Sequence, residues 1–240
     1  GTGLLTQALV NAGARVTAVE ADKSLIAPLR EKFGNAIELI QGDVLSLDFD
    51  RTQAKAWGYH HKTPYKLVAN IPYNITSDLL RRFLTTEPRP SRMVLMLQKE
   101  VADRITAVPP NMSLLSIVCQ FYAHCTRVAR VPAGAFRPIP KVDSAIVRLD
   151  LLPTTYSLQP ESVIAVAKLG FSSPRKQLHR NLSAFASSQD VKAALARLNL
   201  QPTARAQELT VEQWVALAGT LGSRPSTYPQ HQRHFNKPTG

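Results

Sequence analysis

Cysteine and long apolar segments are scarce in this sequence. Its two cysteines, Cys119 and Cys125, lie in an apolar stretch without the C-x-x-C spacing of a metal or redox pair. We therefore expect buried thiols rather than a disulfide, and a reducing compartment. No apolar run approaches the roughly 18 residues that a bilayer-spanning helix needs. A soluble protein with no membrane partner is expected.

Acidic residues are also few relative to basic ones. The 240 residues include 29 Lys and Arg against 17 Asp and Glu, which gives a formal net charge of +12. Such an excess indicates a polyanionic partner such as nucleic acid or, less specifically, an anionic membrane surface. The pairs His60–His61 and His231–His234 have no Cys or acidic residues nearby, so we expect no metal site.

Strand-length and helix-length segments alternate through the first part of the chain. Strands are expected at 15–20, 36–40, 65–69 and 92–97, and helices at 4–10, 22–33, 77–84 and 99–106. This alternation predicts an α/β fold with a Rossmann-like parallel sheet covered by helices on both faces. Two further strands, at 126–131 and 144–149, have no helix-length segment between them and are expected to pair antiparallel.

The pattern changes after residue 152. Amphipathic helices are expected at 161–169, 175–184, 191–198 and 211–221, with no strand among them. The sequence therefore predicts a sheet domain at 1–152 and a small all-α domain at 153–222. Residues 50–64 are expected to form an elaborated loop, and the polar tail at 223–240 is expected to be disordered.

Polar residues follow three successive predicted strands. Gly1-Thr-Gly3 leads into the first helix, and such glycine turns let backbone N–H groups approach a ligand closely. Glu20 ends the next strand about 20 residues on, where an acidic side chain typically accepts hydrogen bonds from ribose. Asp43 and Asn70 follow the next two strands. Together they predict a polar edge that could hold an adenosine-containing cofactor, although each alone is also typical of a solvated cap.

The segment Asn70-Ile-Pro-Tyr73 suits chemistry on an exocyclic amine. The N6 amine of adenine is a poor nucleophile unless its hydrogens are bound by hydrogen-bond acceptors. The Asn70 side chain and the Ile71 carbonyl could supply these acceptors. Tyr73 offers a face on which an extruded base could stack. The alternative is a strand-ending turn in which Asn and Pro act only on conformation.

Five segments in order resemble the motifs of the ribosomal RNA adenine N6-dimethyltransferases. They are Gly1-Thr-Gly-Leu-Leu-Thr6, Val19-Glu-Ala-Asp22, Gly42-Asp-Val44, Asn70-Ile-Pro-Tyr73 and Phe136-Arg-Pro-Ile-Pro-Lys-Val-Asp-Ser144. The resemblance implies a class I methyltransferase sheet with an antiparallel final hairpin, and S-adenosyl-L-methionine as cofactor.

The resemblance also implies roles for individual residues. Gly1 and Gly3 would form part of the turn at the methionine end of the cofactor, Glu20 would hold its ribose and Asp43 its adenine amine. Asn70 would lie beside both the cofactor and the target adenine. Catalysis would depend on Asn70, Tyr73 and Phe136, with the two rings stacking on opposite faces of the target base. A core role for Phe136 is the alternative.

The all-α domain resembles the C-terminal domain of the small-subunit enzymes, which dimethylate two adjacent adenosines near the 3′ end of the rRNA. The expected partner is small-subunit rRNA in a pre-30S-type particle, bound by a monomer in the cytoplasm, with an organellar address left open. The expected phosphate contacts are the basic side chains Arg137, Lys141, Arg175, Lys176 and Arg180, with His179 near the last three.

The chain departs from the family pattern at its start. The family has a cofactor-contacting segment, a first strand, an acidic residue and an earlier glycine before the position of Gly1. We expect either a truncated chain or one without catalysis, with a sheet left incomplete at its centre. The alternatives are a non-catalytic RNA-binding assembly factor, a macrolide-resistance-type large-subunit methyltransferase, and a nucleotide-dependent dehydrogenase. The Asn70–Tyr73 and Phe136–Ser144 motifs argue against the dehydrogenase.

Overall fold

The computed structural model describes residues 1–47, 64–153 and 158–222, and its chain folds into two compact units. The first unit comprises Gly1–Val108 and Leu115–Thr155, and the second comprises Pro109–Leu114 and Tyr156–Gly240. The predicted tail, both histidine pairs and nearly all of the predicted 50–64 loop lie outside the described residues. Within the described ranges, no helix is long and apolar enough to span a bilayer.

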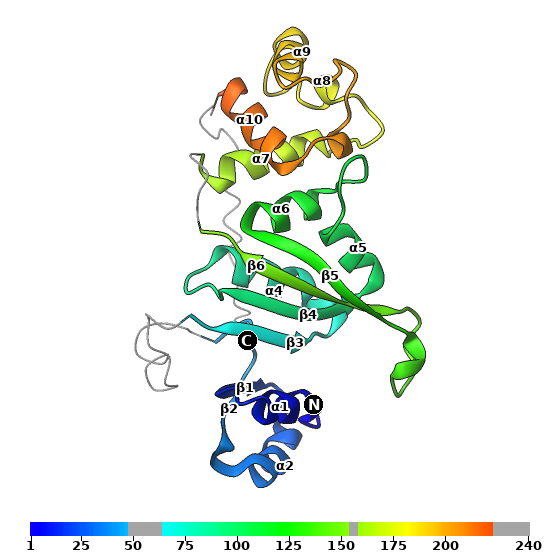
Figure 1. Ribbon diagram of the computed structural model, residues 1–240. Coiled ribbons are helices and arrows are strands. Elements are labelled where there is room, and N and C mark those ends of the chain that lie inside the picture. The colour runs from blue at the N-terminus through cyan, green and yellow to red at the C-terminus, as the bar shows by residue number, and fades with distance from the viewer. Residues whose placement is uncertain (48–63, 154–157, 223–240) are drawn as a thin grey trace, which may run out of the picture. The chain divides into compact units, whose positions relative to one another are not determined.

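The first 47 residues form a two-stranded parallel sheet with two helices (Figure 1). The elements are α1 (Leu4–Asn11), β1 (Val16–Glu20), α2 (Lys23–Phe33), η1 (Gly34–Ala36) and β2 (Ile37–Gln41). Asp22 caps α2 through its side chain, which accepts a hydrogen bond of 2.9 Å from the N–H of Ser24. Gly34, with φ of 50°, ends the helix. The helix predicted over 22–33 is confirmed.

The other four strands form a mixed sheet in the order β3-β4-β6-β5 (Figure 1). They are β3 (Lys66–Asn70), β4 (Arg92–Gln98), β5 (Ala123–Val131) and β6 (Ser144–Leu151). β3 pairs parallel with β4, whereas β6 pairs antiparallel with both β4 and β5. The predicted antiparallel hairpin is confirmed, because a short connection without a helix cannot bring the chain back for a parallel pairing.

Apolar side chains on β4 and β6 form the centre of this sheet. Met93, Leu95 and Leu97 alternate with more exposed residues on β4 and are fully buried. The register places Leu95 opposite Val147 and Leu97 opposite Ala145, so the apolar rows meet across the strands. The accompanying short elements and helices are η2 (Tyr73–Ile75), α4 (Thr76–Thr85), α5 (Lys99–Ile105), α6 (Leu114–Tyr122) and η3 (Ala133–Ala135).

The helix α6 was not predicted. Its residues are apolar or aromatic except Ser116 and Gln120, and it runs directly into β5, so the sequence shows no turn that separates a helix from a strand here. Cys119 on α6 and Cys125 on β5 are free thiols, and burial raises the pKa of Cys125 to about 12 and that of Cys119 further. Cys119 is buried as expected, while Cys125 is half-buried.

The six strands do not form one continuous sheet. Among the described residues, the strand partner of β1 is β2 alone and that of β3 is β4 alone. Each therefore has one edge without a strand partner in the described part of the chain. The expected single parallel sheet is thus divided into a parallel pair and a mixed sheet of four strands.

The second unit is helical, as predicted. Its elements are α7 (Pro160–Gly170), α8 (Leu178–Asn181), α9 (Ser188–Arg197), η4 (Ala206–Glu208) and α10 (Val211–Leu221). The predicted helix at 175–184 is wrong in extent, since α8 has one turn. The Lys176 N–H donates to the Ser173 carbonyl in a separate turn, and the Asn181 amide donates to the carbonyls of Gly170 and Ser173. These bonds commit the backbone before α8 to a turn.

The core of the second unit depends on a close approach between α7 and α10. Trp214 is fully buried, and a Cβ built on Gly170 would lie 2.3 Å from its Cη2 atom and 2.9 Å from Cδ1 of Leu178. Only glycine fits at this point on α7. Gly219 on α10 differs, because a Cβ there would make an ordinary contact of 3.5 Å with Leu158.

We expect Gly170→Ala to lower the free energy of unfolding of the second unit by about 1–3 kcal/mol, because the added methyl overpacks the Trp214 ring. Denaturant titration followed by Trp214 fluorescence in a Trp57→Phe background measures this. Gly219→Ala is the matched control and should leave stability unchanged or raise it by up to about 1 kcal/mol. Equal effects of the two substitutions would contradict the packing argument.

His179 is a buried polar residue of the second unit. It is 8% exposed, and its two ring nitrogens lie 2.8 Å from Gln177 Oε1 and 2.8 Å from Ser188 Oγ. Burial, followed by the positive charges of Lys192 and Arg180, lowers the pKa of His179 from its usual 6.5. The neutral ring is therefore the form that the folded unit favours.

Stability of the second unit should consequently fall in mild acid. Below pH 6.5 the unfolded chain takes up a proton at this histidine while the folded unit resists it, so the free energy of unfolding decreases until the lowered folded pKa is reached. Denaturant midpoints between pH 7.5 and 5.5 measure the decrease. His179→Asn should flatten this dependence, whereas His124→Asn, at an exposed position on β5, should not.

Candidate active site

The turn after β3 presents Asn70 and Tyr73 to solvent around a buried anchor. The side chain of Ile71 is 3% exposed, and its N–H lies 3.4 Å from the Met96 carbonyl of β4. Asn70 and Pro72 are exposed, and Tyr73 is 39% exposed as the first residue of η2. The buried isoleucine fixes the backbone between the two predicted site residues.

A hydrogen bond joins this turn to the start of β6. The Tyr73 hydroxyl lies 3.1 Å from Ser144 Oγ, although the two residues are 71 positions apart. Ser144 is 1% exposed and is paired with Gln98 of β4 and Val131 of β5. The structure thus brings together the two most specific motifs of the sequence, Asn70–Tyr73 and Phe136–Ser144.

Phe136 lies in the loop between β5 and β6. This loop is at the tip of the hairpin (Figure 1) and begins with the turn η3, where the Phe136 N–H donates to the Ala133 carbonyl over 3.1 Å. The Phe136 side chain is half-buried, so part of it is accessible to a ligand and it is not purely a core residue. Arg137 is exposed, and its guanidinium donates to the carbonyls of Gly134 and Phe136. Lys141 is exposed in the same loop.

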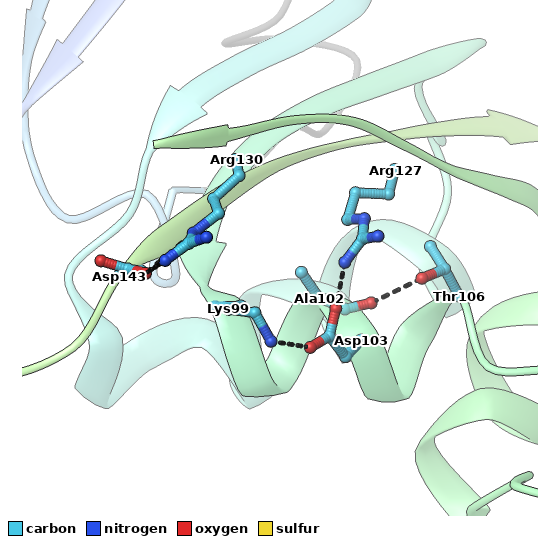
Figure 2. A network of polar contacts seen from close by, with 7 residues as sticks. All are labelled: Lys99, Ala102, Asp103, Thr106, Arg127, Arg130 and Asp143. Carbon is cyan, nitrogen blue, oxygen red and sulfur yellow. Dashed lines mark hydrogen bonds and ion pairs between the residues drawn. The ribbon is translucent and has the colours of Figure 1, made fainter. Parts of the chain in front are cut away.

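Asp143 holds both ends of this loop. Its Oδ2 atom accepts hydrogen bonds from Nε and Nη2 of Arg130, at 2.9 and 2.5 Å (Figure 2). Its Oδ1 atom accepts one of 2.9 Å from the Ala133 N–H. Its carbonyl accepts from the Lys99 N–H over 2.9 Å. The Ala133 bond and then the Arg130 bond lower the pKa of Asp143, which keeps its carboxylate ionised.

A second ion-pair group lies next to it on α5 (Figure 2). Asp103 accepts from Lys99 Nζ and from Arg127 Nη1, each at 2.6 Å. No separate role was predicted for Asp143, Ser144 or this group. The sequence did contain one signal of the Arg130–Asp143 ion pair, because Asp143 comes just before one strand of the predicted hairpin and Arg130 lies near the end of the other.

Glu20 is at the carboxyl end of β1. Its Oε1 atom accepts from the Asp22 N–H over 2.9 Å, and its Oε2 atom forms an ion pair with the Gly1 amino group. Burial alone would raise the pKa of Glu20, but the bonds from Gly1 and Asp22 outweigh it and lower the pKa. The carboxylate that would accept bonds from ribose is therefore ionised.

Asp43 follows β2, beside the end of β1. The Gly42 N–H donates to the Glu20 carbonyl over 2.9 Å, and Asp43 Oδ1 accepts from the Leu45 N–H over 2.9 Å. Gly3 precedes α1 with φ of 78°, and no side chain caps the helix. Two carboxylates and the N–H groups of a helix start fit the ribose, adenine amine and carboxylate of S-adenosyl-L-methionine.

The two groups of predicted site residues lie on different sheets. Gly1, Gly3, Glu20 and Asp43 belong to the β1–β2 region, whereas Asn70, Tyr73 and Phe136 belong to the mixed sheet. Arg82 on α4 connects the regions, since its guanidinium donates to the Leu45 carbonyl over 2.9 Å and to the Leu47 carbonyl. Asn70 therefore lies on the same sheet as Tyr73 and Phe136, the residues predicted to hold the target base.

The basic residues predicted to contact RNA are divided between the units. Arg137 and Lys141 are in the first, whereas Arg175, Lys176 and Arg180 are exposed in the second. His179, which was grouped with the latter three, is buried and hydrogen-bonded to Gln177 and Ser188, so its ring is not part of a basic surface.

Comparison with known proteins identifies relatives over nearly the whole chain. The family model described as ribosomal RNA adenine dimethylase matches residues 1–222. "Ribosomal RNA small subunit methyltransferase A" of Synechococcus elongatus is 40% identical over 92% of this chain and 82% of its own length. The protein of the same name from Rippkaea orientalis is 39% identical over 92% and 84%.

Two solved structures resemble the model. The 23S rRNA methyltransferase ErmE has a TM-score of 0.73 and 28% identity over 92% of this chain and 87% of its own. A dimethyladenosine transferase from Plasmodium falciparum has a TM-score of 0.71 over 90% and 85% of the chains, and at 24% identity it supports the Rossmann-like fold alone. With the family match over residues 1–222, these findings show that the chain belongs to the ribosomal RNA adenine dimethylase family.

Proposed function

We propose that this chain is a methyltransferase that uses S-adenosyl-L-methionine to dimethylate N6 of two adjacent adenosines near the 3′ end of small-subunit rRNA during ribosome biogenesis. The observation that carries the proposal is the hydrogen bond between Tyr73 and Ser144, which holds the Asn70–Tyr73 and Phe136–Ser144 motifs together. The family match and the names of the curated relatives support the substrate class.

The target adenine is held by two acceptors and two rings. The Asn70 side-chain oxygen and the Ile71 carbonyl accept the hydrogens of N6, which turns its lone pair out of conjugation with the base. The buried Ile71 side chain keeps that carbonyl in place. Tyr73 and Phe136 stack on the two faces of the base. Fixed geometry then supplies much of the rate, and the proton leaves N6 after transfer because Asn70 is neutral.

The cofactor is held by the β1–β2 region. Bound S-adenosyl-L-methionine supplies an electrophilic sulfonium methyl group. Glu20 accepts from its ribose hydroxyls as an ionised carboxylate, and Asp43 accepts from its adenine amine. Gly1, Gly3 and the start of α1 direct N–H groups at its methionine end. Asn70 would contact the cofactor from the end of β3.

Phosphate contacts would come from Arg137, Lys141, Arg175, Lys176 and Arg180, which are exposed. The proposed partner is rRNA in a pre-30S-type particle, bound by a monomer in the cytoplasm, with the helical unit serving RNA binding. A second candidate is large-subunit rRNA, because ErmE has a similar fold. The higher identity of the small-subunit relatives favours the small subunit.

Methyl transfer to isolated subunits tests the function. With labelled S-adenosyl-L-methionine and undermethylated small subunits, the full chain should label two adjacent adenosines at N6. Fully methylated small subunits and undermethylated large subunits are the controls and should accept no label. Labelling of large subunits alone would favour the second candidate. Salt-sensitive binding to small subunits without transfer would instead indicate a non-catalytic assembly factor.

Substitution of the two rings tests the stacking arrangement. Tyr73→Ala and Phe136→Ala should each lower transfer about tenfold to a hundredfold, because stacking of a base on an aromatic side chain contributes about 1–3 kcal/mol. Equilibrium binding of S-adenosyl-L-methionine should not change. Val128→Ala, at an exposed apolar position on β5, is the control and should retain full activity. Full activity in both ring variants would disprove two-sided stacking.

A further inference from the structure

The loop that carries Phe136 has few apolar contacts to hold it. Ile139 and Val142 are 63% and 44% exposed, and Pro138 is exposed between the ring and the return to β6. The Arg137 guanidinium donates to carbonyls of the loop itself, those of Gly134 and Phe136. Burial therefore does not fix the position of this loop relative to the sheet, and polar contacts must do so.

Asp143 makes the polar contacts that fix it. Its carboxylate accepts hydrogen bonds from Arg130, which lies near the end of β5. Its carbonyl accepts one from the N–H of Lys99, the first residue of α5. Its remaining oxygen accepts from the Ala133 N–H, ten residues earlier in the chain. Charge-assisted hydrogen bonds of this kind are shorter and stronger than neutral ones.

A short path leads from this carboxylate to the aromatic residue. Asp143 holds the N–H of Ala133, and the carbonyl of Ala133 accepts from the N–H of Phe136 over 3.1 Å. The next residue, Ser144, holds the hydroxyl of Tyr73. Two consecutive residues thus control the backbone of one stacking ring and the side chain of the other.

We propose that Asp143 is a positioning residue, which holds Phe136 at the distance from Tyr73 that a single adenine requires. The inference rests on the proposed function, since the spacing of two rings matters for a base held between them. The proposal also gives a role to Arg130, whose guanidinium binds Asp143 and so stabilises the loop instead of contacting a phosphate group. Loss of the carboxylate leaves the rings present but misplaced, which lowers the rate after RNA has bound.

The chain provides a matched control for this residue. Asp103 lies in the neighbouring ion-pair group and bonds Lys99 and Arg127, but it has no contact with the 132–142 loop among its hydrogen bonds (Figure 2). Asp103→Asn and Asp143→Asn remove the same charge from the same surface. A difference in activity between the two variants is therefore caused by the lost contacts to the loop and not by the lost charge.

Steady-state methyl transfer by the full chain gives the first measurement. Asp143→Asn should lower kcat about tenfold while KM for RNA changes by less than about twofold, because positioning acts on bound substrate. Asp103→Asn should change neither, and Asp143→Glu should recover part of the loss. In a Phe136→Ala background, Asp143→Asn should have little further effect, since both changes then act through one ring. Equal losses in the two aspartate variants, or additive losses with Phe136→Ala, would overturn the proposal.

A spectroscopic measurement separates this inference from the proposed function. The chain has eight phenylalanines, and fluorophenylalanine labelling with Phe136→Leu as the assignment variant identifies the 19F resonance of Phe136. That resonance should shift or broaden in Asp143→Asn and not in Asp103→Asn. This readout needs no activity, so it decides whether Asp143 orders Phe136 even in a chain that transfers no methyl group. An unchanged resonance in Asp143→Asn would refute the proposal.

Discussion

The antiparallel pairing of β6 with both β4 and β5 is the constraint on which the target-base site depends. β6 is hydrogen-bonded along both edges, and its register places Ser144 beside Gln98 of β4 and Val131 of β5. Because β4 also pairs with β3, the start of β6 lies near the turn that follows Asn70, where Ser144 reaches the Tyr73 hydroxyl. A one-residue shift of β6 would move Ser144 to the other face of the sheet and break that bond.

The residues proposed to bind the cofactor depend on a smaller set of interactions. β1 and β2 pair only with each other among the described strands, and the Glu20 carbonyl and side chain collect bonds from Gly42, Asp22 and Gly1. The edge of β1 and that of β3 have no strand partner in the described chain.

Charge has two separate uses in this basic chain. Asp143 engages Arg130 beside the hairpin loop, whereas Asp103 on α5 engages Arg127 of β5. Arg175, Lys176 and Arg180 instead lie exposed on the helical unit, where they can contact phosphate groups. Net charge therefore predicts a polyanionic partner, but it does not identify which Lys and Arg side chains contact that partner.

The sequence by itself determined the order of the elements other than α6, and the residues of the proposed site, because periodicity, turn chemistry and motifs are local. It did not reveal α6, which continues into β5 without an intervening turn, and it extended α8 into a turn that the Asn181 side chain stabilises. Only the tertiary structure decided that Tyr73 meets Ser144, that Asp143 holds the Phe136 loop, and that His179 is buried. These contacts join positions far apart in the chain or depend on burial, and both arise only when strands pair and helices pack.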